Sequence, residues 1–282
     1  MEKLTVRRQN LPMLFVALET SSLQGGVALF ENGECLQETC FSSGPDRGRE
    51  LLPAVGEALR AAGRTPQDLD GIAVGRGPGS YTGMRLGVTA AKTLAFALRC
   101  PVVAESSLRV MAVNALIGSG YVSSGGARSN DPLPSSYVAT VLDGRQTFLY
   151  GALYELRPGC LDSGSPERPP GGSLEGAVEV LVDDRVTDFE GLTREFSRAT
   201  GPTEAPIVLI GDGADLFLER CGDREAGAYV RGSTDWDVAS ARALGYLTAA
   251  RLGEARFSAL DAHRLAPAYL RSTEAERKLA GT

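Results

Sequence analysis

Residues 72–83 read Ile-Ala-Val-Gly-Arg-Gly-Pro-Gly-Ser-Tyr-Thr-Gly, and this stretch is the strongest guide to the fold. Residues 72–75 are short and apolar, which predicts a buried strand, and a helix is predicted over residues 82–98. A glycine-rich strand-to-helix turn can hold an anion on the free N–H groups of the helix. The Walker ending is absent, so a tight turn without a ligand is the alternative. The candidate phosphate-facing residues are Gly77, Gly79 and Ser80.

The predicted helix over residues 82–98 has a small side chain at every fourth position, on one face. The four positions are Gly83, Gly87, Ala91 and Ala95. Each glycine weakens a helix by about 1 kcal/mol relative to alanine, so a closely packed neighbour should offset that cost. The neighbour is either a segment of the same chain or a helix of a partner, and the pattern does not distinguish them.

Three antiparallel strands are predicted to open the chain, over residues 13–19, 26–30 and 34–41. The first strand ends at Glu19, Thr20 and Ser21. An acidic residue followed by hydroxyls can hold a metal-bound phosphate at such a turn. Local hydrogen bonds from the two hydroxyls to the backbone are the alternative explanation.

The sequence divides into two halves that each begin with strands and then alternate helix and strand. This order predicts an α/β protein with mixed sheets flanked by helices. We expect an N-terminal lobe over residues 1–117 and a C-terminal lobe over 118–282, with a long helix at 238–252 that can pack back on the first lobe. The stretches 118–136 and 157–176, rich in Gly, Ser and Pro, are predicted to be mobile loops or a connection.

Two further features complete the set of candidates. A helix predicted over residues 49–62 has an apolar face. Its members are Leu52, Val55 and Leu59. The buried strand predicted over 207–210 is followed by Gly211 and Gly213, a turn of the kind that faces a ligand at the end of a strand.

The composition excludes several classes of site. The net charge of -6 argues against a chain that holds a phosphate backbone by itself, because such domains carry a basic face. The single histidine, His263, excludes any site with two histidine ligands. Five scattered cysteines form neither a disulfide framework nor a zinc motif, and no segment resembles a signal peptide or a membrane span. We therefore expect a cytoplasmic protein without a membrane partner.

Four stretches of the sequence resemble the bacterial TsaB (YeaZ) family. They are Leu-Glu-Thr-Ser at 18–21, Gly-Arg-Gly-Pro-Gly-Ser-Tyr-Thr-Gly-Met-Arg-Leu-Gly at 75–87, Leu-Ala-Phe at 94–96 and Pro-Ala-Tyr-Leu-Arg at 267–271. The resemblance is strong over residues 14–107 and diffuse in the second half. It implies an actin-like, two-lobed fold, shared with sugar kinases and heat-shock ATPases. It also implies a role in making threonylcarbamoyladenosine next to the anticodon of tRNA.

The resemblance implies a scaffold rather than an enzyme. In this family's pathway the paralogue TsaD performs the transfer and binds a metal through His-x-x-x-His, and TsaE is an ATPase. The matching positions in this chain are Ser107 and Met111, which do not bind a hard cation well, so we expect no catalytic residue and no metal site. ATP and the metal are expected in the partner subunits. Binding of tRNA is expected only through the complex.

The family's N-terminal lobe is implied to pack against TsaD or a second copy of the chain. The interface residues expected from this are Leu52, Val55, Leu59, Gly83, Arg85, Gly87, Ala91 and Ala95. Glu19 replaces the family's more usual aspartate, and Arg47-Gly48 stands where many members have His-Ser. These departures leave the details of the partner open.

Three other functions remain as alternatives. An actin-like kinase or ATPase would need a complete nucleotide site, for which Glu19 and the turn at 211–213 are the candidates. A metallopeptidase, suggested by older glycoprotease names, lacks the histidine pair. A self-associating structural protein would share the small-residue helix but would have no affinity for TsaD.

Overall fold

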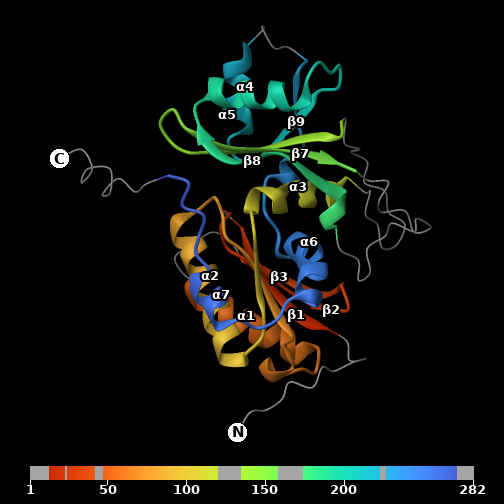
Figure 1. The fold of residues 1–282 in the computed structure, drawn as a ribbon, viewed down its shortest axis with the longest axis vertical. Coiled ribbons are helices and arrows are strands. Elements are labelled where there is room, and N and C mark those ends of the chain that lie inside the picture. Colours follow the sequence, from red (N-terminus) through yellow and green to blue (C-terminus); the bar gives the residue numbers. More distant parts are fainter. Residues whose placement is uncertain are drawn as a thin grey trace, which may run out of the picture.

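The computed structural model describes residues 13–22, 24–41, 47–119, 135–157, 174–222 and 227–271. It has two lobes stacked along the long axis of the molecule, each built on one five-stranded mixed sheet (Figure 1). The strand order is β3-β2-β1-β4-β5 in the first sheet and β10-β9-β6-β7-β8 in the second. Read from the other edge, the second sheet repeats the first: a three-stranded antiparallel meander extended by two parallel strands. This duplicated α/β arrangement is the actin-like fold.

The first sheet is buried on both faces along its central strands. Its strands are β1 (Leu14–Glu19), β2 (Gly25–Glu31), β3 (Glu34–Phe41), β4 (Gly71–Gly75) and β5 (Val102–Glu105). β1 pairs antiparallel with β2 and parallel with β4. Alternate residues of β1 point to opposite faces, so Val16 and Leu18 join one hydrophobic cluster while Phe15 and Ala17 join another.

Helices cover both faces of the first sheet. α1 (Arg47–Ala61) and α2 (Tyr81–Leu98) pack on the Val16 face, where α1 contacts β2 and α2 contacts β4. α6 (Ala241–Glu254) packs across β1, β2, β4 and β5 on the Phe15 face. A helix near the C-terminus of the chain thus completes the core of the N-terminal lobe.

The second lobe has its own sheet and outer helices. Its strands are β6 (Tyr137–Asp143), β7 (Leu149–Leu156), β8 (Val178–Thr187), β9 (Ile207–Ile210) and β10 (Tyr229–Arg231). α4 (Phe189–Thr200) and α5 (Ala214–Cys221) cover the outer face, with Phe196 and Phe217 in the core beneath them. The fold class is therefore as predicted from the sequence.

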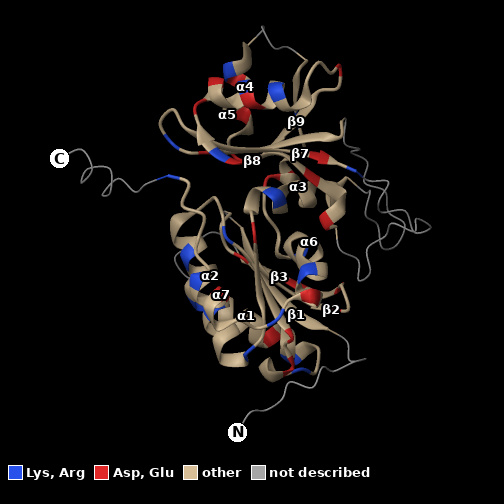
Figure 2. Cartoon of the chain, in the orientation of Figure 1, with Lys and Arg blue, Asp and Glu red and all other residues tan. Residues whose placement is uncertain are grey.

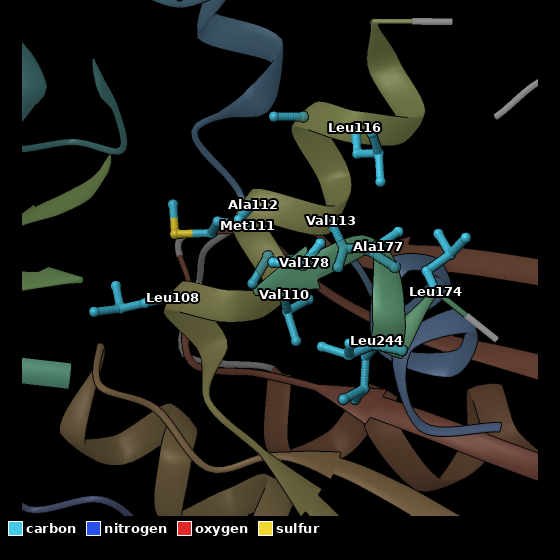
Figure 3. Close-up of a cluster of buried hydrophobic side chains, with 14 of the residues drawn as sticks. Leu108, Val110, Met111, Ala112, Val113, Leu116, Leu174, Ala177, Val178 and Leu244 are labelled. Atoms are coloured by element: carbon cyan, nitrogen blue, oxygen red, sulfur yellow. The ribbon is translucent and has the colours of Figure 1, made fainter. Parts of the chain in front are cut away.

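α3 (Ser107–Gly118) joins the two lobes through one hydrophobic cluster. It packs against α6 on one side and against β6 and β7 on the other. Figure 3 shows Val110 and Val113 of α3 beside Ala177 and Val178, with Leu244 of α6 below them. Because this cluster runs from β1 to β9 without interruption, the lobes share a core rather than meeting at a thin hinge.

The observed elements differ from the predicted ones mainly near the C-terminus. The last element predicted from the sequence was the helix at 238–252, but a further helix, α7 (Ala259–Arg264), follows it and packs on α2. The short strand β10 was not predicted either. Short 3-10 helices occupy Pro66–Asp68, Glu175–Ala177 and Thr234–Trp236. The predicted loops at 118–136 and 157–176 lie mostly outside the described residues. Among the residues that the structure describes, no helix is long and apolar enough to cross a membrane.

Candidate functional site

A cavity of about 880 Å³ lies between the two lobes. Four turns line it, together with the start of α3, residues 237–239 before α6 and Arg271. The turns are those between β1 and β2, between β4 and α2, between β6 and β7, and after β9. The two lobes therefore contribute equivalent turns to one shared space, because their topologies are equivalent.

Glu19 is fully buried beneath this cavity and does not line it. Its carboxylate accepts hydrogen bonds from the Ser21 backbone N–H at 2.7 Å and from the Ser107 hydroxyl at 2.9 Å. Burial raises the pKa of Glu19 above its usual value, although these hydrogen bonds lower it in part. A Cβ at Gly75 would lie 1.8 Å from a Glu19 oxygen, so the glycine makes room for the carboxylate. In this structure Glu19 bonds groups of its own lobe, and the Thr20 hydroxyl donates to the distant Gly83 carbonyl at 2.7 Å rather than to its local backbone.

The turn between β4 and α2 packs directly on the turn after β1. The Ser80 N–H donates to the Ser21 carbonyl at 2.7 Å, and a Cβ at Gly79 would lie 2.4 Å from the same oxygen. Gly77 has a positive φ and donates its N–H to the Ser107 hydroxyl at 3.1 Å. The Ser80 hydroxyl caps α2 by accepting from the Gly83 N–H at 3.3 Å. Ser21, Gly79 and Ser80 line the cavity, whereas Gly77, Thr20 and Glu19 do not.

The turn after β9 is held by carboxylates. Gly211 takes a positive φ and donates its N–H to Asp237 at 2.6 Å. The Gly213 N–H donates to the Val141 carbonyl at 3.0 Å. Neither glycine lines the cavity, but Asp212 between them does. Burial raises the pKa of Asp212, which accepts a hydrogen bond from the backbone of Asp143 at 2.9 Å.

The charged side chains around the cavity are mixed in sign. The acidic ones are Asp143, Asp212 and Asp237, and the basic ones are Arg145 and Arg271. Asp237 is already paired with Arg231, which lies outside the cavity. An excess of carboxylates disfavours a polyphosphate unless a metal ion accompanies it.

The small-residue face of α2 lies inside its own lobe, which corrects one interpretation of the pattern. Gly83, Gly87, Ala91 and Ala95 are all buried. A Cβ at Gly83 would lie 1.9 Å from the Thr20 carbonyl oxygen. In this conformation these four residues contact the end of β1 and the first sheet, so the expectation that they form the surface for a partner is wrong.

The apolar face predicted for α1 is also divided between core and surface. Val55 and Leu59 are buried against the first sheet, so they do not present a surface to a partner either. Leu52 is different, since 52% of it is exposed. Arg85 of α2 is exposed as well. Of the eight expected interface residues, these two are accessible.

The positions that match the TsaD histidines lie at the cavity but carry no ligand set. Ser107 and Met111 both line it. The Ser107 hydroxyl donates a hydrogen bond to Glu19 and accepts one from the Gly77 N–H. In the part of the chain that the structure describes, no group of three or more His, Cys, Asp and Glu side chains could hold a metal ion.

Sequence reasoning missed a cluster of aromatic and arginine side chains at the edge of the cavity. The sequence shows no strip of alternating aromatic and basic residues, but the fold assembles one from distant segments. Tyr81 of α2 lies beside Tyr269, and Arg271 lies over the ring of Phe148. The closing Pro-Ala-Tyr-Leu-Arg motif contains one aromatic and one basic residue of this cluster. The sequence alone does not reveal which side chains lie beside them in the fold.

Comparison with known proteins finds similarity to TsaB (YeaZ) proteins and to the TsaD family. A family model described as TsaD, tRNA N6-adenosine threonylcarbamoyltransferase, matches residues 47–168. The tRNA threonylcarbamoyladenosine biosynthesis protein TsaB of Bacillus subtilis (strain 168) is 29% identical over 94% of this chain and 97% of that protein. The protein of the same name from Haemophilus influenzae is 40% identical over 37% of this chain and 43% of that protein. YeaZ from Pseudomonas aeruginosa, a solved structure, is 26% identical and superposes with a TM-score of 0.66 over 92% of this chain and 100% of that chain.

The duplicated sheets and the cavity between them define a two-lobed, actin-like α/β protein. The relatives above show that the chain is similar to TsaB (YeaZ) proteins over nearly its whole length. The relatives from Bacillus subtilis and Haemophilus influenzae are named for the biosynthesis of threonylcarbamoyladenosine in tRNA.

Proposed function

We propose that this chain is a non-catalytic subunit that activates a TsaD-type threonylcarbamoyltransferase by forming a heterodimer with it. The observation that carries the proposal is the pair Ser107 and Met111 at the positions of the TsaD metal ligands. Ser107 supports Glu19 and the turn before α2 through hydrogen bonds, and Met111 is a core residue. A thioether and an already bonded hydroxyl are poor ligands for a hard cation. ATP and the metal would then come with the partner subunits, TsaD and TsaE.

The exposed face of α1 is the surface that best fits the partner. Leu52 is 52% exposed, and the neighbouring Pro53 is exposed too. Gly56, one turn further on, has open space where a side chain would point. An exposed leucine beside a small residue allows another helix to approach closely, in the helix-on-helix packing common at subunit interfaces.

Co-purification with TsaD from the same organism tests this surface. We expect Leu52→Glu to abolish the heterodimer on size exclusion, because a buried, unpaired carboxylate is costly. Val180→Glu is the matched control, since Val180 is 39% exposed on β8 of the other lobe. Equal binding by both variants would reject the α1 surface. A wild-type chain that elutes only as a homodimer beside free TsaD would reject the heterodimer itself.

A modification assay tests the non-catalytic role separately. We expect TsaD and TsaE with ATP to modify tRNA only when this chain is added. The variant Ser107→Ala should stay active as an activator if it folds, because the residue supports a turn rather than a reaction. Full modification without the chain would contradict the proposal.

One observation favours the second candidate, an actin-like nucleotide-binding enzyme. The cavity between the lobes has about 880 Å³ and is bounded by turns from both sheets. Against this candidate, Glu19 is buried and fully engaged, and carboxylates outnumber cations around the space. We therefore expect ATP or ADP with Mg²⁺ to leave the Tm of the isolated chain unchanged. A rise in Tm that grows with nucleotide concentration would favour the enzyme instead.

A further inference from the structure

Five side chains at the edge of the inter-lobe cavity form two groups in which aromatic rings and guanidinium groups lie against one another, and the C-terminal segment contributes one side chain to each group. We call them the aromatic–arginine ladder. Its members are Phe148, Arg271, Tyr269, Tyr81 and Arg85. They come from the turn before β7, from the C-terminal segment and from the first turns of α2, so only the folded chain brings them together.

The contacts within the aromatic–arginine ladder are direct. The guanidinium carbon of Arg271 lies 4.5 Å from the centroid of the Phe148 ring. The rings of Tyr269 and Tyr81 are 5.4 Å apart, with an angle of 34° between their planes. Arg85 lies 5.4 Å from the Tyr81 ring and donates to its hydroxyl at 3.1 Å. These distances are those of cation–π and aromatic pairs.

The aromatic rings of the ladder are on the surface. Tyr81 is 46% exposed, Tyr269 48% and Phe148 36%. They belong to the few large hydrophobic side chains that the described part of the chain leaves exposed. Exposed rings that pair with arginines do not serve the core, so the ladder offers aromatic faces to a ligand.

The ladder is held in place before any ligand arrives. Arg271 donates to the Gly144 carbonyl at 2.6 Å and to the Gln146 side chain at 2.8 Å. The Ala268 N–H donates to the Arg76 carbonyl at 2.8 Å. These bonds tie the C-terminal segment to both lobes, which lowers the entropy that binding would otherwise cost.

The charged members of the ladder are both basic, although the chain as a whole is acidic and the adjoining cavity also holds three aspartates. The net charge is -6, but α2 contains no Asp or Glu, and its charged residues are Arg85 and Lys92. Figure 2 shows blue segments without red along α2. Within the cavity, Arg145 and Arg271 lie among Asp143, Asp212 and Asp237, so the excess of positive charge is confined to the ladder and α2. A short anionic segment with flat, stackable groups complements this arrangement.

We propose that the aromatic–arginine ladder binds an unpaired segment of RNA, whose bases stack on the tyrosines while Arg85 and Arg271 contact its phosphates. Aromatic rings and arginines that are interleaved are the usual platform for single-stranded RNA. The proposal deepens the proposed function, because it makes this subunit a direct contact for the tRNA substrate. Tyr and Arg are also common in protein interfaces, so a protein ligand is an outcome of the test.

Binding of the full chain to fluorescent oligoadenylate, measured by anisotropy at low ionic strength, tests the ladder. We expect the single strand to bind better than a duplex of the same length. Tyr81→Ala and Tyr269→Ala should each weaken binding by about five- to tenfold, and Tyr81→Phe should keep it. Phe96→Ala is the matched control, because Phe96 is an exposed ring on the same helix, outside the ladder. Arg85→Gln should reduce the slope of log K against log salt by about 0.7.

The outcomes separate this proposal from the heterodimer. Loss of RNA binding in the tyrosine variants, with TsaD association intact, supports the ladder as an RNA site. Loss of TsaD association with RNA binding unchanged overturns it and makes the ladder a protein interface. No binding by the wild-type chain, or equal binding of single strand and duplex, also overturns it, whatever the co-purification result.

Discussion

Gly83 and Gly87 let α2 touch the end of β1 without any side chain between them. The Thr20 hydroxyl donates to the Gly83 carbonyl at 2.7 Å. A Cβ at Gly87 would lie 2.4 Å from that hydroxyl, and a Cβ at Gly83 would lie 1.9 Å from the Thr20 carbonyl oxygen. At the scale of residues, the cost of glycine in a helix is therefore offset by close packing inside one lobe.

Substitution of one of these glycines should destabilise the chain itself. We expect Gly83→Ala to lower the free energy of unfolding by about 1–3 kcal/mol, because backbone must move to admit the methyl group. Gly56→Ala on α1 is the matched control, since nothing lies within 4 Å of a Cβ there. Its higher helix propensity should raise the free energy of unfolding by about 0.5–1 kcal/mol. Urea unfolding of both variants measures the difference, and two equal changes would contradict this account.

The spacing of the small residues was visible in the sequence, but the identity of their neighbour was not. A period of four shows that one face of α2 is small. Whether that face meets Thr20 or a partner depends on where β1 ends in space, which no local pattern records. The same limit applies to Tyr81 and Tyr269, whose rings meet although 188 positions separate them in the sequence (269 − 81 = 188).

At the scale of elements, a strong hydrophobic period was enough to predict the ends of an element that packs in or on a sheet. β9 and α2 were predicted to within one residue at each end, because burial dictates their patterns. α7 was missed because it has six residues, too few for a period to emerge. Its stability comes from contacts with α2 that lie more than 160 positions away in the chain.

Lys92 of α2 is the contact that should decide whether α7 is ordered. Its ammonium group donates to the His263 carbonyl at 2.7 Å and to the Leu265 carbonyl at 3.0 Å, at the C-terminal end of α7. A cation there satisfies free carbonyls and favours the helix dipole. We expect Lys92→Met to speed hydrogen exchange of the amides in residues 259–268 by about tenfold, which corresponds to roughly 1.4 kcal/mol.

The control for this exchange experiment is Arg60→Met, which removes an exposed cation from the last turn of α1. Its exchange pattern in residues 259–268 should match that of the wild type. Unchanged exchange in Lys92→Met would mean that apolar packing on α2 holds α7 without the lysine.

At the scale of the whole molecule, the two lobes are joined by polar bonds as well as by a shared core. The Ser106 hydroxyl caps α3 and donates to Asp184 of β8 at 2.7 Å. Glu105, next to it, is paired with Arg109 and Arg251. These groups link the end of the first sheet to the second sheet, so their protonation should affect the stability of the whole chain.

Asp184 should make the chain less stable as the pH rises. Burial, only partly opposed by the Ser106 hydrogen bond and Arg76, raises its pKa from 3.8 to about 6. Glu105 and Asp183 add to the increase. A carboxyl whose pKa is higher in the folded state stabilises it fully below the unfolded pKa, and this contribution is lost as the pH rises through about 6.

Replacing Asp184 by asparagine isolates this effect, because the amide can still accept the Ser106 hydrogen bond. We expect Asp184→Asn to exceed the wild type in free energy of unfolding by about 2–3 kcal/mol at pH 8, and by nearly nothing at pH 4. Asp183→Asn, at an exposed neighbour on the same strand, controls for charge alone. Since Asp184 joins β8 to the cap of α3, a gain confined to high pH would show that the charge on this carboxyl limits how firmly the lobes hold together. An equal gain at both pH values would instead mean that the added stability of the variant comes from packing and not from the loss of charge.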